Sequence, residues 1–267
     1  MQPKPTFLGQ QTASAFQEQS VAEAYQQRPP YPDAVFDILA GLAVDQPGRL
    51  LDAGCGTGFI ARLMVGRVAH IDALDISPAM IERGKRLPGG DASTLSWIIG
   101  SAEDAPLNPP YALITAGDSL HWMEWDVVLP RFAEMLTPNG SLAILGVGQD
   151  SAPWDGELLP VIQRYSTVIG YHRYDLVAEL ESRGLFQIFG RETTRPVPFS
   201  QSLDAYIESF HGRASFSRER MDAEASRAFD DEVRTLVSRH LVQDAARAVT
   251  LHVVTEVVWG KPLRPGR

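Results

Sequence analysis

Three glycines at alternate positions, Gly54, Gly56 and Gly58, follow a short apolar run that ends in Asp52. Glycine adopts positive φ without steric cost and lets a ligand approach the backbone closely. The segment after the glycines is helix-like, and a helix that begins there would direct its free N–H groups into the same space. The spacing therefore predicts a tight, ligand-binding turn between a strand and a helix.

Two kinds of ligand compete for such a turn. A dinucleotide requires the spacing Gly-x-Gly-x-x-Gly, which would put the third glycine at position 59, where this chain has Phe59. An acid at the end of the next strand, here Asp75, accepts ribose hydroxyls in a dinucleotide or in another nucleoside. The glycine spacing thus disfavours a nicotinamide dinucleotide, whereas Asp75 does not discriminate.

Apolar runs alternate with helix-like segments around this turn. Strands are expected at residues 49–53, 69–75, 95–99, 111–116, 141–147, 185–191 and 248–259. Helices are expected from Ser77-Pro78 onward and at residues 11–27, 33–41, 57–66, 126–136, 153–170, 174–183 and 201–243. The alternation predicts an α/β fold, a doubly wound Rossmann-like sheet of about seven strands, mostly parallel with a closing antiparallel hairpin, plus a helical cap.

The composition narrows the class of partner. The 267 residues carry a net charge of −9, whereas nucleic acids and anionic membranes attract clustered Lys and Arg, so a small molecule is expected instead. With no export signal and no apolar run of about 18 residues, we expect a cytoplasmic protein. The single cysteine, Cys55, is expected to pack inside the turn, and no residue spacing indicates a metal site. The oligomeric state stays open.

The pattern Asp52-x-Gly54-x-Gly56-x-Gly58 resembles the first motif of the class I S-adenosylmethionine-dependent methyltransferases, in particular their small-molecule, type 11-like members. Later segments are similar to that family in order, at residues 100–104, 111–122 and 129–140. Upstream, Tyr25-x-x-Arg28-Pro29-x-Tyr31-Pro32 resembles the family's N-terminal signature. The resemblance covers about residues 20–150. It implies S-adenosyl-L-methionine as cofactor, S-adenosyl-L-homocysteine as product, and methyl transfer to oxygen, nitrogen or carbon.

On this resemblance we expect four segments in one domain with a cap. They are an N-terminal helical arm over the site (residues 1–48, hereafter the arm), the cofactor-binding α/β core (49–150), cap helices inserted around the last two strands (151–260, hereafter the cap), and a tail (261–267). The arm and the cap would then carry the specificity for the acceptor.

The resemblance also implies which residues hold the cofactor. Asp75 would accept both ribose hydroxyls, and Arg28 would bind the methionine carboxylate or else stack on a tyrosine. Asp52 would either orient the cofactor's ammonium group or bond backbone N–H groups of the turn. The full expected set is Tyr25, Arg28, Asp52, Gly54, Cys55, Gly56, Asp75, Ile76, Met80, Ser101, Ala102, Glu103 and Ala116. Acids usual in the family are replaced by Ser101 and Ala112.

The chemical step needs few catalytic groups. Alignment of the acceptor with the sulfonium methyl can supply roughly 7–11 kcal/mol, whereas a general base contributes about 10²–10⁴-fold. If a base acts, His121 is the first candidate and Asp118 the second, because both follow the fourth strand. The alternative for His121 is packing beside Trp122. An apolar acceptor pocket would draw on two or three of the cap's aromatic and histidine side chains, and the others would pack in the core of the cap helices. The sequence does not distinguish which of them these are among Trp154, Tyr165, Tyr171, His172, Tyr174, Phe210, His211 and Phe216.

Two other functions remain open at this point. The protein could use the cofactor as a structural or electrostatic element, for example in a cyclisation. It could also be a non-catalytic protein that senses the cofactor. Both share the fold and the cofactor site with a methyltransferase, so only the fate of the methyl group distinguishes them.

Overall fold

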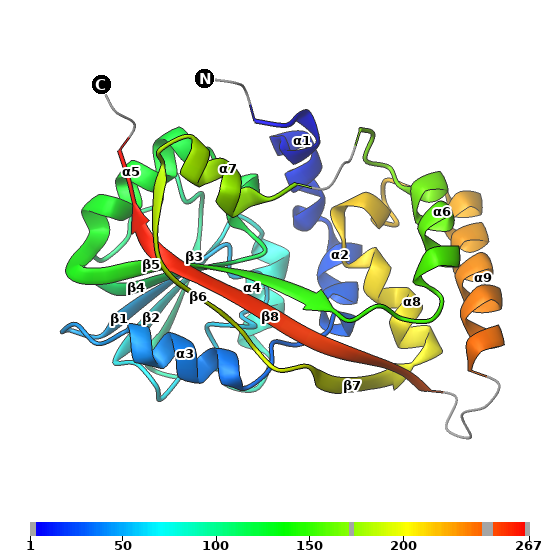
Figure 1. The fold of residues 1–267 in the computed structure, drawn as a ribbon, viewed down its shortest axis with the longest axis horizontal. Coiled ribbons are helices and arrows are strands. Elements are labelled where there is room, and N and C mark those ends of the chain that lie inside the picture. Colours follow the sequence, from blue (N-terminus) through cyan, green and yellow to red (C-terminus); the bar gives the residue numbers. More distant parts are fainter. Residues whose placement is uncertain (1–3, 171–173, 242–247, 265–267) are drawn as a thin grey trace.

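The computed structural model describes residues 4–170, 174–241 and 248–264. One sheet dominates it, with the strand order β3-β2-β1-β4-β5-β8-β6 and with β7 also paired to β8. Helices cover both faces of this sheet, and the cap helices lie beside it (Figure 1). The predicted fold class, a largely parallel Rossmann-like sheet with an antiparallel part and additional helices, is confirmed.

The parallel strands match the predicted ones closely. They are β1 (Arg49–Ala53), β2 (His70–Asp75), β3 (Leu95–Ile99), β4 (Tyr111–Gly117) and β5 (Leu136–Gln149). Neighbouring side chains on β1 enter different hydrophobic cores, Leu51 on one face of the sheet and Leu50 on the other. Both faces are therefore covered, as the apolar strand sequences require.

The order of the strands reverses between β1 and β4, which pair in parallel with Asp52 opposite Thr115. In such sheets ligands bind in the crevice beyond the carboxyl ends of the strands at this switch point. The glycine turn follows β1 directly, so it lies at that crevice.

Three helices complete the core, α3 (Ala34–Leu42), α4 (Pro78–Lys85) and α5 (Trp125–Met135). The start of α4 follows the sequence pattern: Ser77 Oγ accepts a hydrogen bond from the backbone N–H of Met80, and Pro78 occupies the first turn. This cap fixes the chain immediately after Asp75.

The prediction of a helix at residues 57–66 is wrong. The segment forms hydrogen-bonded turns, in which the bonds from Arg62 N to Gly58 O and from Met64 N to Ile60 O have the helical spacing. Gly58 and Gly66 have positive φ, 79° and 80°, which a right-handed helix does not admit. The glycines that shape the turn therefore also limit the helix after it.

The arm is broken into short helices where one helix was expected at 11–27. They are η1 (Thr6–Leu8), α1 (Gln10–Ala13), η2 (Ser14–Gln17), α2 (Gln19–Ala24) and η3 (Tyr25–Gln27). The α2 helix buries Val21 and Ala22 against Met80 of α4. The arm thus packs on the core beside the carboxyl ends of the strands.

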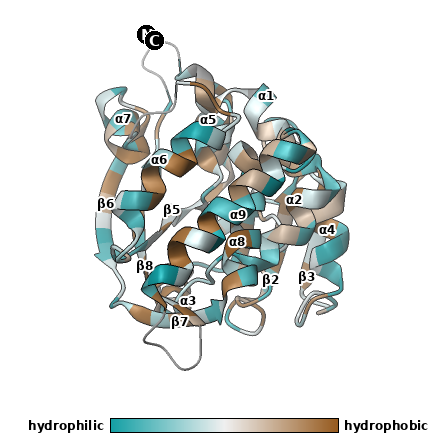
Figure 2. Cartoon of the chain, turned by 90° about the vertical axis from the view of Figure 1, so that its right-hand side faces the viewer, coloured by the Kyte–Doolittle hydropathy of each residue, from teal (hydrophilic) through white to brown (hydrophobic). Residues whose placement is uncertain are grey.

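The cap contains α6 (Asp155–Tyr165), α7 (Leu176–Ser182), α8 (Leu203–His211), η5 (Ala214–Phe216) and α9 (Ala223–His240). Helices α6, α8 and α9 enclose a separate hydrophobic cluster that includes Phe210, Phe229 and Val233. These helices carry hydrophobic and hydrophilic bands in alternation (Figure 2). Among the helices described, none is both long and apolar enough to span a bilayer.

Three strands lie at the antiparallel end of the sheet, β6 (Phe186–Thr193), β7 (Val197–Ser202) and β8 (Ala248–Pro262). The long β8 strand pairs with β5 on one side and with both β6 and β7 on the other. Strand β7 was not predicted, because Pro198 interrupts its short sequence and most of its side chains are exposed. Strand β8 continues two residues into the expected tail.

Candidate active site

The glycine turn is joined to the end of β2 by a buried carboxylate. The two oxygens of Asp75 accept hydrogen bonds from the backbone N–H groups of Gly56 at 2.7 Å and Ser77 at 2.8 Å. Burial raises the pKa of Asp75, although both hydrogen bonds oppose that shift. The Asp75 carboxylate therefore faces the turn, and its bonding to ribose hydroxyls stays a prediction.

A glycine is required at the start of the turn for two reasons. Gly54 has a φ of 70°, and a Cβ atom there would lie 2.5 Å from the Cβ atom of Ser119. The hydroxyl of Ser119 in turn donates to the carbonyl of Ala53 at 2.7 Å. The turn is thus held tightly against the segment that follows β4.

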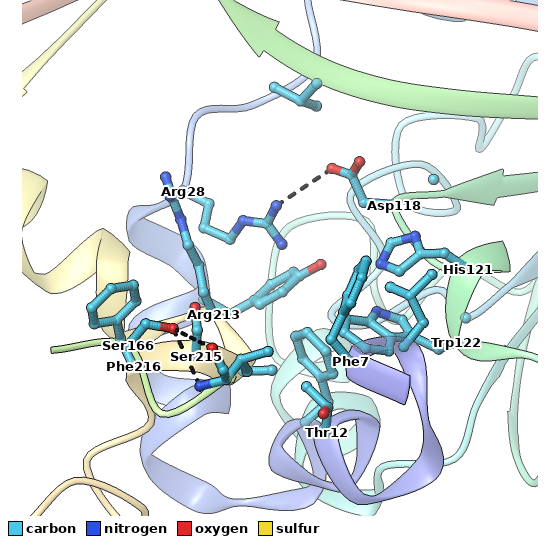
Figure 3. A pocket seen from close by; sticks show the side chains of 18 of the residues that line it. Phe7, Thr12, Arg28, Asp118, His121, Trp122, Ser166, Arg213, Ser215 and Phe216 are labelled. Atoms are coloured by element: carbon cyan, nitrogen blue, oxygen red, sulfur yellow. Dashed lines mark hydrogen bonds and ion pairs between the residues drawn. The ribbon is translucent and has the colours of Figure 1, made fainter. Parts of the chain in front are cut away.

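A pocket of about 1150 Å³ opens beside this turn. Its walls come from the arm, from the carboxyl ends of β1, β4 and β5, and from the cap. Figure 3 shows Arg28, Asp118, His121 and Trp122 around it, with Arg213 and Phe216 contributed by the cap. The predicted cofactor-binding and catalytic residues that line it are Tyr25, Arg28, Asp52, Gly54, Cys55, Asp118 and His121.

The other predicted cofactor residues do not line this pocket in the part of the chain that the structure describes. Asp75 is 8% exposed, Ile76 is 52% exposed, and Met80 is buried under the arm. Ser101 donates a short hydrogen bond to Glu103, whose other oxygen accepts from the backbone N–H of Glu124. The remaining members of this group are Gly56, Ala102 and Ala116.

Tyr25 packs directly against the glycine turn. Its ring lies against Gly56, so that a Cβ atom at Gly56 would come within 3.3 Å of the ring. The same ring contacts Phe59 at 5.8 Å and Phe16 at 6.5 Å between centroids. The arm therefore packs directly on the glycine turn through Tyr25, which also lines the pocket.

An ion pair connects the arm with the end of β4. Arg28 Nη2 lies 3.4 Å from Asp118 Oδ2, and the guanidinium also lies 5.0 Å from the centre of the Tyr25 ring. The stacking on a tyrosine that was considered for Arg28 therefore occurs, and binding of the cofactor's carboxylate by Arg28 stays a prediction. Asp118 has a φ of 48°, a left-handed conformation that is uncommon outside glycine and concentrates at functional sites.

His121 belongs to η4 (Leu120–Trp122) and faces the pocket. Burial, with smaller contributions from the charges of Lys4 and Arg28, lowers the pKa of its imidazole to about 3. Its ring also packs on Trp122 with 4.5 Å between centroids. The imidazole is thus neutral at physiological pH, and it is a weaker base than an unperturbed histidine.

Asp52 holds the turn from below. Its carboxylate accepts hydrogen bonds from the backbone N–H of Ala61 at 3.1 Å and from Thr115 Oγ1 at 2.9 Å. Burial outweighs these bonds and raises the pKa of Asp52 to about 7. These contacts show that Asp52 bonds the backbone after the turn. Asp52 also lines the pocket, and its contact with the cofactor's ammonium group stays a prediction.

The cap contributes residues that the sequence reasoning missed. Arg213, Ser215, Leu159, Ile162 and Ile169 line the pocket, and no local pattern in the sequence distinguishes them. Most of the cap aromatics pack elsewhere: Trp154, Tyr165 and Phe210 lie in the cap cluster, and Tyr174 stacks on Trp125. Of the eight aromatics proposed for the pocket, Phe216 lines it, and Tyr171 and His172 lie outside the described residues.

The arm and the cap are also connected directly. Arg220 Nε donates to Glu18 at 2.6 Å, and its two other nitrogens reach the carbonyl of Gln11 and the hydroxyl of Ser14. Ser217 donates a short hydrogen bond to the second oxygen of Glu18. The walls that the arm and the cap give to the pocket are therefore fixed to each other.

These features fit a sulfonium nucleoside. Each oxygen of Asp75 accepts one N–H, which leaves acceptor capacity for a ribose diol. Arg28 offers a cation for an amino-acid carboxylate. The glycine turn bonds to Asp75 through Gly56 and lines the same pocket as Arg28 through Gly54 and Cys55. Among the described residues, no cluster of His, Cys, Asp and Glu could hold a metal ion.

Comparisons with solved structures define the class first. A candidate type II methyltransferase from Anaeromyxobacter dehalogenans superposes with a TM-score of 0.64 at 19% identity, over 88% of this chain and 97% of that chain. Residues 50–140 also match a family described as a methyltransferase domain. The fold is therefore that of the Rossmann-like methyltransferases.

Curated relatives then define the family. Malonyl-[acyl-carrier protein] O-methyltransferase from Serratia marcescens is 30% identical over 65% of this chain and 71% of its own length. Trans-aconitate 2-methyltransferase from Methylobacterium nodulans is 39% identical, but the match spans 40% of this chain and 42% of that relative. The chain belongs to the class I S-adenosylmethionine-dependent methyltransferases, and the predicted resemblance is confirmed.

Proposed function

We propose that this protein transfers the methyl group of S-adenosyl-L-methionine to a small-molecule acceptor by in-line displacement. The observation that carries the proposal is the glycine turn, which bonds to the buried Asp75 carboxylate through Gly56 and lines a pocket of about 1150 Å³ with Gly54 and Cys55. The bound cofactor supplies an electrophilic methyl: the acceptor's electron pair forms the new bond to carbon, the C–S pair stays on sulfur, and S-adenosyl-L-homocysteine is released.

The chain's own residues bind and orient the cofactor in this proposal. Asp75 accepts both ribose hydroxyls, and Arg28 pairs with the methionine carboxylate. The backbone of Gly54, Cys55 and Gly56 follows the ribose and methionine portions, and the carbonyl of Ala116 accepts from the ammonium group. The adenine is held by Ile76, Met80, Ser101, Ala102 and Glu103, with Tyr25 covering the turn.

Alignment and exclusion of water supply most of the rate enhancement. The arm and the cap enclose the acceptor's end of the pocket, which favours a near-attack geometry worth roughly 7–11 kcal/mol. The acceptor's proton, where there is one, passes to Asp118 or to His121. Burial raises the pKa of Asp118 in spite of Arg28, whereas burial lowers the pKa of His121. Asp118 is therefore a stronger candidate for the base than its second place in the sequence-based order implied.

The class of acceptor is proposed from the relatives and from the charge. The relatives' names specify trans-aconitate and a malonyl group on its carrier, which are not nucleic acids. The net charge of −9 likewise disfavours a nucleic-acid substrate and suits a cytoplasmic enzyme for small molecules.

Incubation with methyl-labelled S-adenosylmethionine and a dialysed extract fractionated by size tests the proposal. We expect label in a low-molecular-mass product and stoichiometric S-adenosylhomocysteine. Cofactor binding without label transfer would favour a structural or sensing role for the cofactor. Binding of NADH in its place would contradict the cofactor assignment as well.

A further inference from the structure

The cap places a second guanidinium in the pocket, close to the Arg28–Asp118 pair. Arg213 follows the end of α8, where its backbone N–H bonds to the carbonyl of Phe210 at 3.0 Å, and its guanidinium lies 4.8 Å from the centre of the Phe210 ring. Its side chain extends toward Arg28 (Figure 3). The charge of Arg213 also acts on Asp118, where together with Arg28 it opposes the upward shift of the pKa.

Positive charge exceeds negative charge around Arg28 and Arg213. Arg28, Arg213 and Asp118 together carry a net charge of +1, while Asp52 lies at the floor with a pKa of about 7. The bound cofactor's ammonium, sulfonium and carboxylate groups would add a further +1, so the site stays net positive even when Asp52 is ionised. An anionic acceptor is therefore attracted to this site, and a cationic one is repelled.

Apolar side chains from the cap also line this pocket. Leu159 and Ile169 line it although they are 53% and 90% exposed, and Ile162 lies on the α6 face beside Leu159. Exposed apolar side chains that border a pocket mark a surface which an apolar ligand would cover. The pocket is thus amphipathic, because it combines the two arginines with exposed aliphatic side chains.

We propose that the acceptor is a carboxylic acid with an apolar body, whose carboxylate is bound by Arg213. A guanidinium presents two parallel N–H donors to a carboxylate and has five in all, so Arg213 can bind the acceptor in addition to its neighbours in the protein. This proposal rests on the proposed function, because it assigns the substrate class of the same site. Arg213 is an acceptor-binding residue in it, distinct from Arg28, which serves the cofactor.

The test compares octanoate with octanamide, which have the same chain and differ in charge. Calorimetry in the presence of saturating S-adenosylhomocysteine measures their binding without turnover. We expect octanoate to bind about tenfold more tightly than octanamide, a modest ratio because Arg213 is exposed to the pocket. Equal binding of the two probes, or binding of neither, would overturn the proposal.

Variants of Arg213 assign the effect to this residue. Arg213→Gln should abolish the preference for octanoate, Arg213→Lys should retain part of it, and Arg213→Glu should make octanamide the tighter ligand. The matched control is Arg164→Gln on α6, which removes a cap arginine paired with Glu232 at the surface and should leave the preference intact. A preference that persists in Arg213→Glu would contradict the assignment.

The same titrations separate this inference from the proposed function. Binding of S-adenosylhomocysteine to the wild type and to every Arg213 variant tests the cofactor site alone. If that binding is absent, the proposed function fails. If it is present and octanoate has no advantage, the proposed function stands and the carboxylate assignment fails.

Discussion

Arg28 of the arm lies 3.4 Å from Asp118 at the end of β4, and this ion pair bridges the pocket above the glycine turn. The two residues are 90 positions apart in sequence, and they meet because the arm folds over the carboxyl ends of the strands. Each would be costly alone in this half-buried position. Together they mark the place where we propose that the charged amino-acid end of the cofactor binds.

Arg28→Met should therefore weaken cofactor binding by about 10- to 100-fold, the loss expected for a charge-assisted hydrogen bond. The variant also leaves Asp118 without its cation, so Arg28→Met/Asp118→Asn should recover stability but not affinity. Equilibrium binding of S-adenosylhomocysteine and urea unfolding measure the two effects separately. Affinity restored in the double variant would mean that Arg28 only neutralises Asp118.

Gly54→Ala should destabilise the protein more than Gly66→Ala does. Both glycines have positive φ, 70° and 80°, so alanine costs roughly 1–2 kcal/mol at either position. A Cβ atom at Gly54 would also collide with Ser119. A Cβ atom at Gly66 would meet no atom within 4 Å beyond its neighbours in the chain, in the part of the structure that is described. Overpacking adds about 1–3 kcal/mol, which urea denaturation of the two variants resolves. Equal losses would show that the close approach to Ser119 relaxes freely.

Asp52 should couple cofactor binding to pH. Because burial raises its pKa to about 7, the group is largely protonated in the free protein below that pH. A cationic cofactor favours the carboxylate, so binding at pH 6.5 should release a proton, and affinity should rise as the pH increases through 7. Calorimetry in phosphate and in Tris, which differ in ionisation enthalpy, measures the released proton.

Asp52→Asn is the corresponding variant for that experiment. It should reduce proton release and flatten the dependence of affinity on pH. The exposed residue Asp37, changed to Asn, serves as the control for loss of one acid. Unchanged proton release in Asp52→Asn would assign the effect to the other buried acids of the site, Asp75 and Asp118.

The contact between Arg220 and Glu18 should slow the release of the bound cofactor product. Arg220→Gln removes the cation that fixes the arm to the cap, so the arm should open more often and S-adenosylhomocysteine should dissociate about three- to tenfold faster. Stopped-flow tryptophan fluorescence, to which Trp122 in the pocket contributes, can follow this release. Arg234→Gln, which breaks an exposed pair with Asp204 on the same cap, is the control. Equal rates in the two variants would contradict a role for this contact.

Local chemistry made much of the core predictable. Ser77 and Pro78 mark a helix start through capping, which depends on neighbours in sequence, and the structure shows that cap. Asp52 and Asp75 end buried apolar runs, so their positions at the edge of the sheet follow from the periodicity alone.

The errors arose where tertiary structure decides. We predicted that Gly58 belongs both to a ligand-binding turn and to the helix after it. Its positive φ excludes a regular helix at that position. Arg213 reaches the pocket only because α8 and η5 pack beside the arm, a contact between segments almost 200 residues apart. Tyr25 was expected at the site, but its position on Gly56 depends on how the short arm helices bend.

The most direct test of the cofactor site is calorimetric titration of S-adenosylmethionine into the wild type, Asp75→Asn and Ser77→Ala. We predict one site in the wild type, a loss of affinity of about 10- to 100-fold in Asp75→Asn, and little change in Ser77→Ala, which loses only the helix cap. Unaltered affinity in Asp75→Asn, or tight binding of NADH in place of S-adenosylmethionine, would contradict the account.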